Sequence, residues 1–549
     1  MPQVSVPKEP FDAVVVGSGA TGGWAAKRLT EAGWRVALLE AGPKITPKDF
    51  TEHMQPWQMK YLGQSPAILR DRPIQGLCYA CRESNQQWFV NDFENPYTQA
   101  KPFHWIRERV LGGRSLSWGR QTYRMSDLDF KCASHDGWGD DWPISYDEMV
   151  PYYEIVEKYV GISGQSEGLP QLPDSVFQPP MAMTCGEQIL RDRVKEKMGR
   201  VVTMGRVAIL TKPHNGRAAC HYCGPCEQGC STFSYFSSPW TTIADAQRTG
   251  KLTLICDAVA AQIPTKDGKA TGVMYIDGVT REPKEVRARV VVLCASTLES
   301  TRLLLNSKIC DQNEALGHYV MDHQYGGSVV GVMPMLESRA WAGPPRRPNG
   351  IYIPRFRNVT DKTTNGFIRG YGYQGGSSPA FDQDAPGFGA AYKEAVRKGH
   401  WNINLMAFCE CLSRKENYVE IDRDRVDAWG VPVLKMNCEY GDNETKLWND
   451  SREQAAQMME AAGAKDVHLT GKPSVFGFCI HEVGTARMGN DARTSVVNRF
   501  NQAHDVKNIF VTDGACWVSS GNQNPTLTMM AITVRACDYI TKEYAKQTV

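Results

Sequence analysis

The stretch from residue 11 to residue 40 restricts the possible fold of this chain more than any other part. FDAVVV, at 11–16, is an unbroken apolar run, which is typical of a strand buried on both faces of a sheet. GSGATGG follows it, then the helix-forming stretch WAAKRLTEAG, then a second apolar strand, WRVALLE. This order predicts the strand–turn–helix–strand unit of a dinucleotide-binding α/β fold.

The glycines of this unit have distinct expected roles. Gly17 permits the tight turn, Gly19 lets the backbone approach a diphosphate, and Gly22 lets the helix pack on the strand. The positive end of the helix then faces the phosphates. Glu40 ends the second strand, where it can accept hydrogen bonds from both ribose hydroxyls. The motif by itself does not separate NAD from FAD.

Later segments extend the predicted nucleotide fold. In LGGRSLSWGR, Gly112 and Gly113 form a turn that can pass close to a flat ring. RVVVLCAST and NIFVTDGACW each contain a further apolar strand of the same sheet. Asp513 ends the second of these strands; it either caps a turn or contacts the cofactor near its diphosphate or ribityl chain, and we favour the contact. The nucleotide fold is therefore assembled from the start, middle and end of the chain.

Composition narrows the class of protein. The chain has 549 residues, of which 42% are hydrophobic and 22% charged, as in globular proteins of two or more domains. Its net charge of +2, without a basic stripe, argues against nucleic acid as a partner. We interpret most of its 17 cysteines as buried hydrophobic residues, and the CxxC pair Cys78 and Cys81 as ordinary loop cysteines.

Targeting signals are not expected on this chain. No charged stretch followed by an apolar core opens it, and it contains no run of 18 apolar residues, so we expect no signal peptide and no transmembrane segment of its own. We expect a periplasmic protein that a signal-bearing partner subunit carries across the membrane in folded form. A cytoplasmic location is the alternative.

Four cysteines lie close together in CHYCGPCEQGC: Cys220, Cys223, Cys226 and Cys230. Four thiolates in so short a loop predict an iron–sulfur cluster. The alternatives are a zinc knuckle, although zinc sites usually set two cysteine pairs far apart, or a loop of free or paired cysteines. Because a cluster moves electrons singly, we expect the electrons to pass to another protein and not to oxygen or a nicotinamide.

Two C-terminal stretches, HEVGTARMG and SSGNQNPTLTMMAITVRACDYI, supply a candidate catalytic pair. His481 begins the first, and Asn524 lies in the second, just before an amphipathic helix expected from Pro525. A flavin that oxidises an alcohol needs a base for the hydroxyl proton while hydride leaves the same carbon. Histidine suits this role because its pKa lies near neutrality, whereas asparagine can orient the hydroxyl but cannot take the proton.

Together these motifs resemble those of the glucose–methanol–choline (GMC) oxidoreductases. The resemblance covers nearly the whole chain and includes GSGATGG with Glu40, LGGRSLSWG, LGHYVMDH (316–323), HEVGTARMG and GNQNPTLT. It implies an α/β fold with a Rossmann-like FAD-binding domain and a substrate domain built from a sheet and helices. It also implies that His481 is the catalytic histidine and that Asn524 occupies the position of its partner.

The resemblance also bears on how the flavin is held. In pyranose oxidase, a histidine in the loop equivalent to LGGRSLSWG bonds covalently to the flavin. This chain has Ser117 at that position, just before Trp118. A hydroxyl cannot form the same linkage, so we expect non-covalent FAD, with the loop shaping the reactive edge of the ring.

The cysteine loop resembles that of membrane-linked bacterial glucose and fructose dehydrogenases in this family. Those enzymes hold a 3Fe–4S cluster with three cysteines spaced like Cys220, Cys226 and Cys230. Because this chain adds Cys223, we favour a 4Fe–4S cluster, and a 3Fe–4S cluster with Cys223 free is the alternative. Other segments are most similar to glucoside 3-dehydrogenases, which form 3-keto sugars and use a small partner subunit and a cytochrome c acceptor.

The expected domains are discontinuous. The FAD-binding domain comprises residues 1–60, 101–130, 200–320 and 472–549, including the iron–sulfur loop, and the substrate domain comprises residues 61–100, 131–199 and 321–471. Within 321–471 we expect two strands at 417–437, a helix that stops at Gly463, and a Gly-rich loop at 369–389. Six residues there are singled out: Tyr373, Gln374 and Trp401 as possible sugar contacts, Glu410 as a substrate contact or a structural carboxylate, and Met458 with Met459 as core.

The resemblance therefore predicts an FAD-dependent dehydrogenase that oxidises a secondary hydroxyl of a sugar or glucoside, at carbon 3. One alternative is a sugar oxidase that reduces oxygen. A second is a dehydrogenase of the glucose or gluconate type that acts at the anomeric carbon. The third is a non-catalytic flavin-binding subunit.

Overall fold

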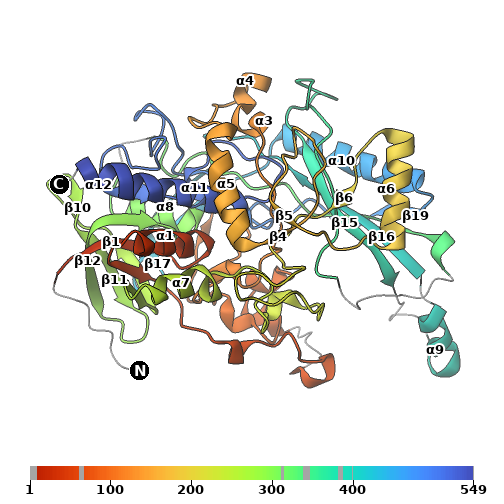
Figure 1. The fold of residues 1–549 in the computed structure, drawn as a ribbon, viewed down its shortest axis with the longest axis horizontal. Coiled ribbons are helices and arrows are strands. Elements are labelled where there is room, and N and C mark those ends of the chain that lie inside the picture. Colours follow the sequence, from red (N-terminus) through yellow and green to blue (C-terminus); the bar gives the residue numbers. More distant parts are fainter. Residues whose placement is uncertain are drawn as a thin grey trace.

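The computed structural model describes residues 9–60, 67–310, 314–337, 347–380, 387–398 and 400–547 (Figure 1). Among these residues the strands form two larger sheets and three small ones. The strands of the first larger sheet lie in the order β7 (Leu252–Ile255), β2 (Val36–Leu39), β1 (Phe11–Val16), β12 (Pro283–Leu293), β11 (Gly272–Asp277) and β8 (Ala258–Gln262), and β20 (Ile509–Val511) pairs with β12.

The first sheet contains the predicted nucleotide fold. β1 pairs in parallel with β2 and β12, β2 with β7, and β12 with β20, as expected for strands that are apolar on both faces. β11 and β8 extend the sheet in antiparallel fashion. The predicted strands of FDAVVV, WRVALLE, RVVVLCAST and NIFVTDGACW are all confirmed, and the segments that form the sheet come from the start, middle and end of the chain.

Helices cover this sheet. α1 (Ala20–Glu31) packs against α7 (Thr242–Arg248) and α11 (Thr526–Tyr539), and α11 packs against α5 (Tyr146–Val160) (Figure 1). α11 lies between its neighbours and is buried nearly all round, so the predicted amphipathic pattern was wrong for this helix. A π-helical turn at Ile540–Tyr544 and α12 (Ala545–Gln547) follow α11.

The second larger sheet is antiparallel. Its strands lie in the order β19 (Lys465–Leu469), β13 (Val329–Val332), β16 (His400–Cys409), β15 (Tyr371–Ala380), β14 (Ile351–Ile353) and β6 (Thr203–Met204). α6 (Cys185–Met198) and α10 (Asp442–Ala461) pack on it (Figure 1). Met458 and Met459 of α10 are fully buried, which confirms that they belong to the core.

The Gly-rich stretch predicted as a loop at 369–389 is mainly the strand β15, and residues 381–386 lie outside the described residues. The prediction was wrong because glycine also fits a strand where other backbone approaches closely. A Cβ on Gly375 would lie 2.1 Å from the carbonyl oxygen of Asn404 on the neighbouring strand β16. The glycines of β15 therefore permit close strand packing.

A smaller sheet joins β17 (Tyr418–Val426), β18 (Pro432–Asn437) and β3 (Thr98–Gln99). β17 and β18 are antiparallel, which confirms the two strands predicted at 417–437. The remaining elements are β4 (Ile162–Ser163) with β5 (Phe177–Gln178), β9 (Thr265–Lys266) with β10 (Lys269–Ala270), α2 (Ala67–Asp71), α3 (Asp127–Phe130), α4 (Cys132–Asp136), α8 (Thr297–Asn306) and α9 (Gly389–Lys398).

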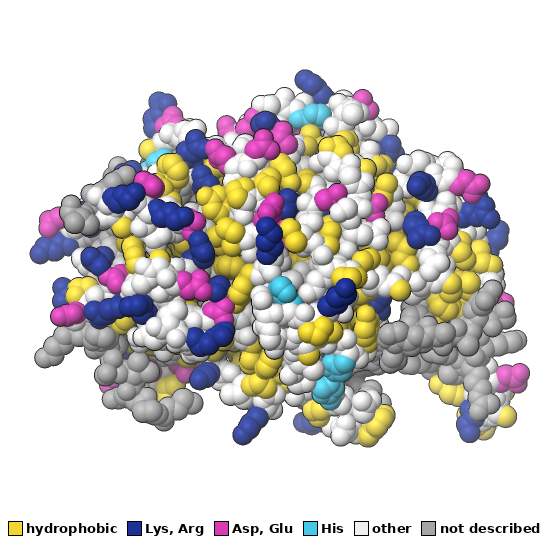
Figure 2. Space-filling view, in the orientation of Figure 1, with side chains coloured by type: hydrophobic (Ala, Val, Ile, Leu, Met, Phe, Trp, Pro, Cys, Tyr) yellow, Lys and Arg dark blue, Asp and Glu magenta, His cyan; other side chains and the backbone are white. Residues whose placement is uncertain are grey.

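The distribution of charge on the surface agrees with the composition of the chain. On the face shown in Figure 2, acidic and basic side chains are intermixed, consistent with a net charge of +2. No helix in the described part of the chain combines the length and apolar character needed to cross a bilayer.

Candidate active site

The two predicted catalytic side chains meet in the structure. Asn524 Nδ2 lies 3.1 Å from His481 Nε2, although the residues are 43 positions apart. Asn524 directly precedes Pro525 and α11, and His481 lies in the extended segment that leads from the second sheet back to β20. The site therefore forms where the residues just before α11, a helix that covers the first sheet, meet the segment of His481.

A second histidine, His323, determines which nitrogen of His481 is the base. His323 Nε2 lies 2.5 Å from the carbonyl oxygen of Gly521, and a carbonyl only accepts, so this nitrogen donates its proton. In the neutral ring, His323 Nδ1 is then an acceptor, and it lies 2.9 Å from His481 Nδ1. His481 Nδ1 must therefore hold the proton, which leaves the lone pair of His481 on Nε2, facing Asn524.

Burial keeps both rings neutral. Burial lowers the pKa of His323 to about 4, against the opposing effect of its hydrogen bond to Gly521. Burial, and then the charges of His323 and Arg114, hold the pKa of His481 well below its ordinary value. His481 is thus an unprotonated base at neutral pH.

One carboxylate holds the backbone of both histidines. Asp322 Oδ1 accepts hydrogen bonds from the backbone N–H groups of His323, at 2.9 Å, and His481, at 3.1 Å, and its Oδ2 accepts one from Cys479 N, at 3.2 Å. Asp322 is fully buried, and burial raises the pKa of its carboxyl well above the ordinary value. This residue ties the LGHYVMDH segment to the loop of His481.

The second sheet orients Asn524. Gln374 on β15 donates from Nε2 to Asn524 Oδ1, at 2.7 Å, so that the amide nitrogen of Asn524 faces His481 Nε2. Asn524 therefore donates to His481 Nε2, which requires that this nitrogen carry the lone pair. The hydrogen bond from His323 to the carbonyl of Gly521 places the lone pair on the same nitrogen. Gln374, a possible sugar contact in the sequence, contacts a catalytic residue. Tyr373 instead donates to the backbone of Ser451.

The glycine loop is joined to the catalytic loop through an ion pair. Arg114, within LGGRSLSWG, lies 3.0 Å from Glu482 and also donates to the carbonyl of Ile480, at 3.2 Å. Gly112 and Gly113 have φ values of +97° and +46°, which glycine adopts without strain. The segment predicted to shape the flavin edge is therefore fastened next to His481.

The N-terminal glycines form a cradle that fits a diphosphate. A Cβ on Gly22 would lie 1.8 Å from the carbonyl oxygen of Gly17, so this position allows only glycine. A Cβ on Gly19 would meet nothing within 4 Å, which means that the backbone there faces open space. No side chain caps α1 at Gly19, so its first N–H groups are available to phosphate oxygens.

Glu40 directly follows β2, beside this cradle. It accepts hydrogen bonds from the backbone N–H groups of Ser18, at 3.2 Å, and Gly42, at 2.8 Å. Burial raises its pKa, and these hydrogen bonds oppose the rise. The carboxyl thus lies at the position where an adenine-nucleotide ribose is expected, so the residues present fit the FAD that the sequence predicts.

Other predicted cofactor contacts have protein partners. Asp513 caps the short helix Gly514–Cys516 and accepts from Ser300 of α8, so it does cap a turn; its contact with the cofactor stays a prediction. Ser117 donates to Glu108, and Trp118 Nε1 donates to the carbonyl of Phe236, at 3.0 Å.

Glu410 is a structural carboxylate in this fold. It forms a buried ion pair with Arg355, at 2.8 Å, and accepts from Gly370 N, at 3.0 Å. Burial raises its pKa to about 7. Of the two roles expected from the sequence, a substrate contact or a structural carboxylate, these contacts agree with the second.

The cysteine loop lies beside the second sheet. Cys226, and with it Cys220 and Cys230, packs against the hydrophobic core of that sheet. A zinc ion held by four thiolates would place their sulfurs about 3.8 Å apart. Among the described residues, the groups whose ligand atoms all lie within 4.8 Å of one another are His53–His221–Cys223 and His323–Cys479–His481, and the four loop cysteines together are not such a group. Cys78 and Cys81 are buried in another hydrophobic cluster.

His323 and Asp322 are absent from the residues selected from the sequence. Both belong to LGHYVMDH, a segment that the sequence marks as a motif but to which it assigns no role. An adjacent Asp–His pair in such a motif is the signal that could have identified them. Their role depends on contacts with residues more than 150 positions away, which no local pattern reveals.

Alanine substitutions at two glycines separate folding from cofactor binding. Gly22→Ala should destabilise the fold by about 1–3 kcal/mol or more, because the added methyl overlaps the Gly17 carbonyl. Gly19→Ala should leave the thermal stability of the flavin-free protein unchanged and weaken FAD binding. Thermal unfolding and flavin titration measure both effects, and equal FAD affinity in Gly19→Ala and the unchanged protein would contradict the cradle.

Substitution of His323 tests the tautomer argument. His323→Leu should slow flavin reduction by up to about 10²–10⁴-fold, the range that a positioned base contributes, with little change in KM. His323→Asn, whose amide oxygen can replace Nδ1 as the acceptor, should recover part of the rate. Since the folded pKa of His481 lies below 6.5, kcat/KM should be constant above that pH and fall as acid protonates the base. Equal rates in the Leu and Asn variants would refute this role.

Comparison with known proteins places the chain in a family. The GMC oxidoreductase models match residues 11–325 and 413–533. The chain is 31% identical to 2-methyl-1,2-propanediol dehydrogenase of Mycolicibacterium austroafricanum, over 97% of this chain and 96% of that protein. It is 27% identical to the fructose dehydrogenase large subunit of Gluconobacter japonicus, over 96% and 97%. A C-glycoside 3-oxidase of Microbacterium trichothecenolyticum is 26% identical over 53% of this chain and 54% of its own length.

The fold agrees with these matches. The structure of an Aspergillus oryzae formate oxidase variant superposes with a TM-score of 0.63 at 15% identity, covering 99% of this chain and 100% of the other. The first family model alone spans more than half of the chain. The predicted resemblance and fold class are therefore confirmed: this chain is an enzyme of the GMC oxidoreductase family, whose members bind FAD.

Proposed function

We propose that this chain oxidises a secondary hydroxyl of a sugar or glucoside, at carbon 3, and passes the electrons through an iron–sulfur cluster to a cytochrome-type acceptor. The observation that supports the chemistry is the arrangement of His481 and Asn524, whose facing atoms lie 3.1 Å apart. FAD, when bound, supplies the acceptor for the hydride. The residues of the cradle and Glu40 would hold it.

The side chains define how the hydroxyl is handled. His481 Nε2 carries the lone pair of the ring, which faces Asn524 Nδ2 at 3.1 Å, and it accepts the proton of the hydroxyl when substrate is bound. Asn524 Nδ2, held by Gln374, donates to the hydroxyl oxygen and so fixes the direction of the C–O bond. The proton that His481 accepts stays next to a neutral His323, whose lowered pKa prevents it from taking a second positive charge.

The relatives support a carbohydrate substrate. The printed names of two of them refer to fructose and to oxidation at carbon 3 of C-glycosides. A different observation favours a small diol, since the relative at 31% identity is named for 2-methyl-1,2-propanediol. We propose the sugar because two of these relatives are named for carbohydrates.

Anaerobic mixing with substrates tests this proposal. Methyl glucoside should bleach the bound flavin and yield a 3-keto product, while His481→Ala should keep FAD and lose flavin reduction by about 10²–10⁴-fold. A lactone from glucose would indicate oxidation at the anomeric carbon, and reduction by the propanediol alone would favour the diol. Undiminished reduction in His481→Ala would remove this residue from the mechanism. Oxygen consumption that matches product formation would identify an oxidase.

The iron–sulfur proposal rests on the surroundings of the cysteine loop. Cys220 Sγ accepts from Tyr222 N, at 3.4 Å, and Cys230 Sγ accepts from Ser234 N, at 3.3 Å. Backbone N–H groups of this kind stabilise thiolates that ligate iron and tune the cluster.

A buried cation beside the loop favours an anionic group there. Arg120 is 8% exposed, and its Nε and Nη1 have no hydrogen-bond partner among the described residues. Burial raises the pKa of Cys226, and the charge of Arg120 opposes that rise. Since an unpaired buried charge is costly, Arg120 fits an anionic iron–sulfur cluster at Cys220, Cys226 and Cys230. Arg120 also follows LGGRSLSWG directly, so the loop at the flavin site leads to the loop of cysteines.

Metal analysis tests the cluster. In protein purified without oxygen, Cys226→Ser should lose most of its iron and keep substrate-driven flavin reduction, whereas Cys81→Ser should keep its iron. Both cysteines are buried, so they form a matched pair for effects on folding. Absence of iron from the unchanged protein would refute the cluster.

The partner subunit, the electron acceptor and the location of this chain are also proposals. The fructose dehydrogenase relative is named a large subunit, which supports a small partner subunit for this chain. A cytochrome c acceptor and a periplasmic location, with the partner supplying the export signal, follow from the resemblance to glucoside 3-dehydrogenases. Co-purification of a small subunit with the full chain, and fractionation of the cells, would test the partner and the location.

A further inference from the structure

Cys223 differs from the other cysteines of the loop in the residues that it packs against. Cys220, Cys226 and Cys230 pack against the hydrophobic core of the second sheet, and among the described residues Cys223 is not part of that cluster. Cys223 instead lies with two histidines, His53 and His221. We call the side of the loop on which Cys223 meets these two histidines its outer side.

The outer side presents a convergent set of metal ligands. The ligand atoms of His53, His221 and Cys223 all lie within 4.8 Å of one another, and His53 Nε2 is 2.9 Å from His221 Nε2. A tetrahedral zinc ion, with bonds of about 2.0–2.1 Å to nitrogen and 2.3 Å to sulfur, needs ligand atoms about 3.3–3.8 Å apart. The observed spacing is within the range that a small movement of exposed side chains can close.

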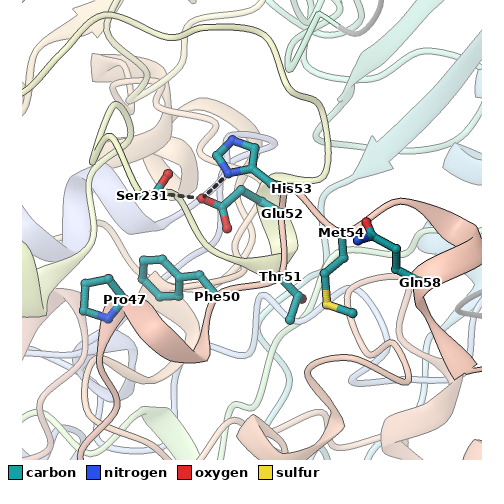
Figure 3. A pocket seen from close by; sticks show the side chains of 8 residues that line it. All are labelled: Pro47, Phe50, Thr51, Glu52, His53, Met54, Gln58 and Ser231. Carbon is teal, nitrogen blue, oxygen red and sulfur yellow. Dashed lines mark hydrogen bonds and ion pairs between the residues drawn. The ribbon is translucent and has the colours of Figure 1, made fainter.

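The second nitrogen of each imidazole has its own polar neighbour. His53 Nδ1 lies 3.8 Å from Glu52 Oε1, and His221 Nδ1 lies 3.4 Å from Thr232 Oγ1. Figure 3 shows Glu52 between Ser231 and the ring of His53, and the backbone N–H of Ser231 donates to this carboxylate at 2.6 Å. Histidines that bind metals are oriented in this way, through the nitrogen that does not face the metal.

The two segments that supply the ligands are docked on each other. Thr51 N donates to the carbonyl of Gln228, at 3.0 Å, and a Cβ on Gly229 would lie 2.4 Å from the ring of Phe50. The positions of His53 and of the cysteine loop are thus set by packing independently of any metal. His53 and His221 are 168 positions apart, so a shared ion would close a long loop of the chain.

We propose that His53, His221 and Cys223 bind one divalent d-block cation of the zinc class. Two imidazoles and a thiolate are borderline and soft ligands, which select such cations over magnesium or calcium. The side chain of His53 is 56% exposed, so the fourth coordination position is open to water. Cys223 is then not a ligand of the iron–sulfur cluster, which has three irons in this arrangement; only this corollary rests on the proposed function.

The experiment uses the full chain with its flavin and iron, purified without oxygen and treated with a mild chelator. Zinc binding is measured by calorimetry, the zinc ligands by X-ray absorption at the zinc edge, and iron in parallel. Cys223→Ser and His53→Gln are compared with two control variants at exposed residues, Cys185→Ser on α6 and His468→Gln on β19; His53 is likewise exposed, and Cys223 is half-buried. Glu52→Gln tests the orienting carboxylate.

We expect one zinc ion in the unchanged protein and the controls, with nitrogen at about 2.0–2.1 Å and sulfur at about 2.3 Å. Cys223→Ser and His53→Gln should lose this ion and keep their iron, and Glu52→Gln should weaken zinc binding by about 10–100-fold. Zinc affinity unchanged in both variants, or no zinc in the unchanged protein, would overturn the site. Loss of iron from Cys223→Ser would also overturn it, because Cys223 would then be a cluster ligand. Absence of iron everywhere would refute the cluster alone.

Discussion

The hydrogen bond from His323 to the carbonyl of Gly521 is the constraint on which the proposed chemistry depends. A carbonyl oxygen accepts and never donates, so this contact orders the protons along the whole chain of groups to His481 Nε2. Burial then keeps both rings neutral, because a charged imidazole in this environment would lose its hydration. In the proposed chemistry, the role of His481 as general base thus depends on its position and burial.

The site is assembled by segments that are remote in sequence. Asp322 holds the backbone of His323 and His481, Gln374 reaches Asn524 from the second sheet, and Arg114 joins the glycine loop to Glu482. Each of these contacts is a hydrogen bond or ion pair in a largely buried environment, where the loss of one partner is expensive. The two sheets must therefore be packed correctly before the active site has its final geometry.

The surroundings of the cysteine loop are also assembled from segments that are remote in sequence. Arg120 lies at the end of the glycine loop and faces Cys226 with donors that lack partners among the described residues. On the other side of the loop, His53 and His221 approach Cys223. The spacing of the four cysteines in the sequence favours one cluster. In the fold, Cys220, Cys226 and Cys230 pack against the core of the second sheet, whereas Cys223 also approaches two histidines.

The sequence by itself determined the nucleotide-binding unit and the strands of its sheet, because local periodicity and turn glycines encode these features directly. Its resemblance to the GMC oxidoreductases implied the family and the pairing of His481 with Asn524. It failed where glycine has two uses, at β15, and where a helix is enclosed by others, at α11. Only the tertiary structure decided which nitrogen of His481 is the base and where Cys223 lies. His323 and Gly521 are 198 positions apart, and no local pattern specifies a contact that chain packing creates over such a distance.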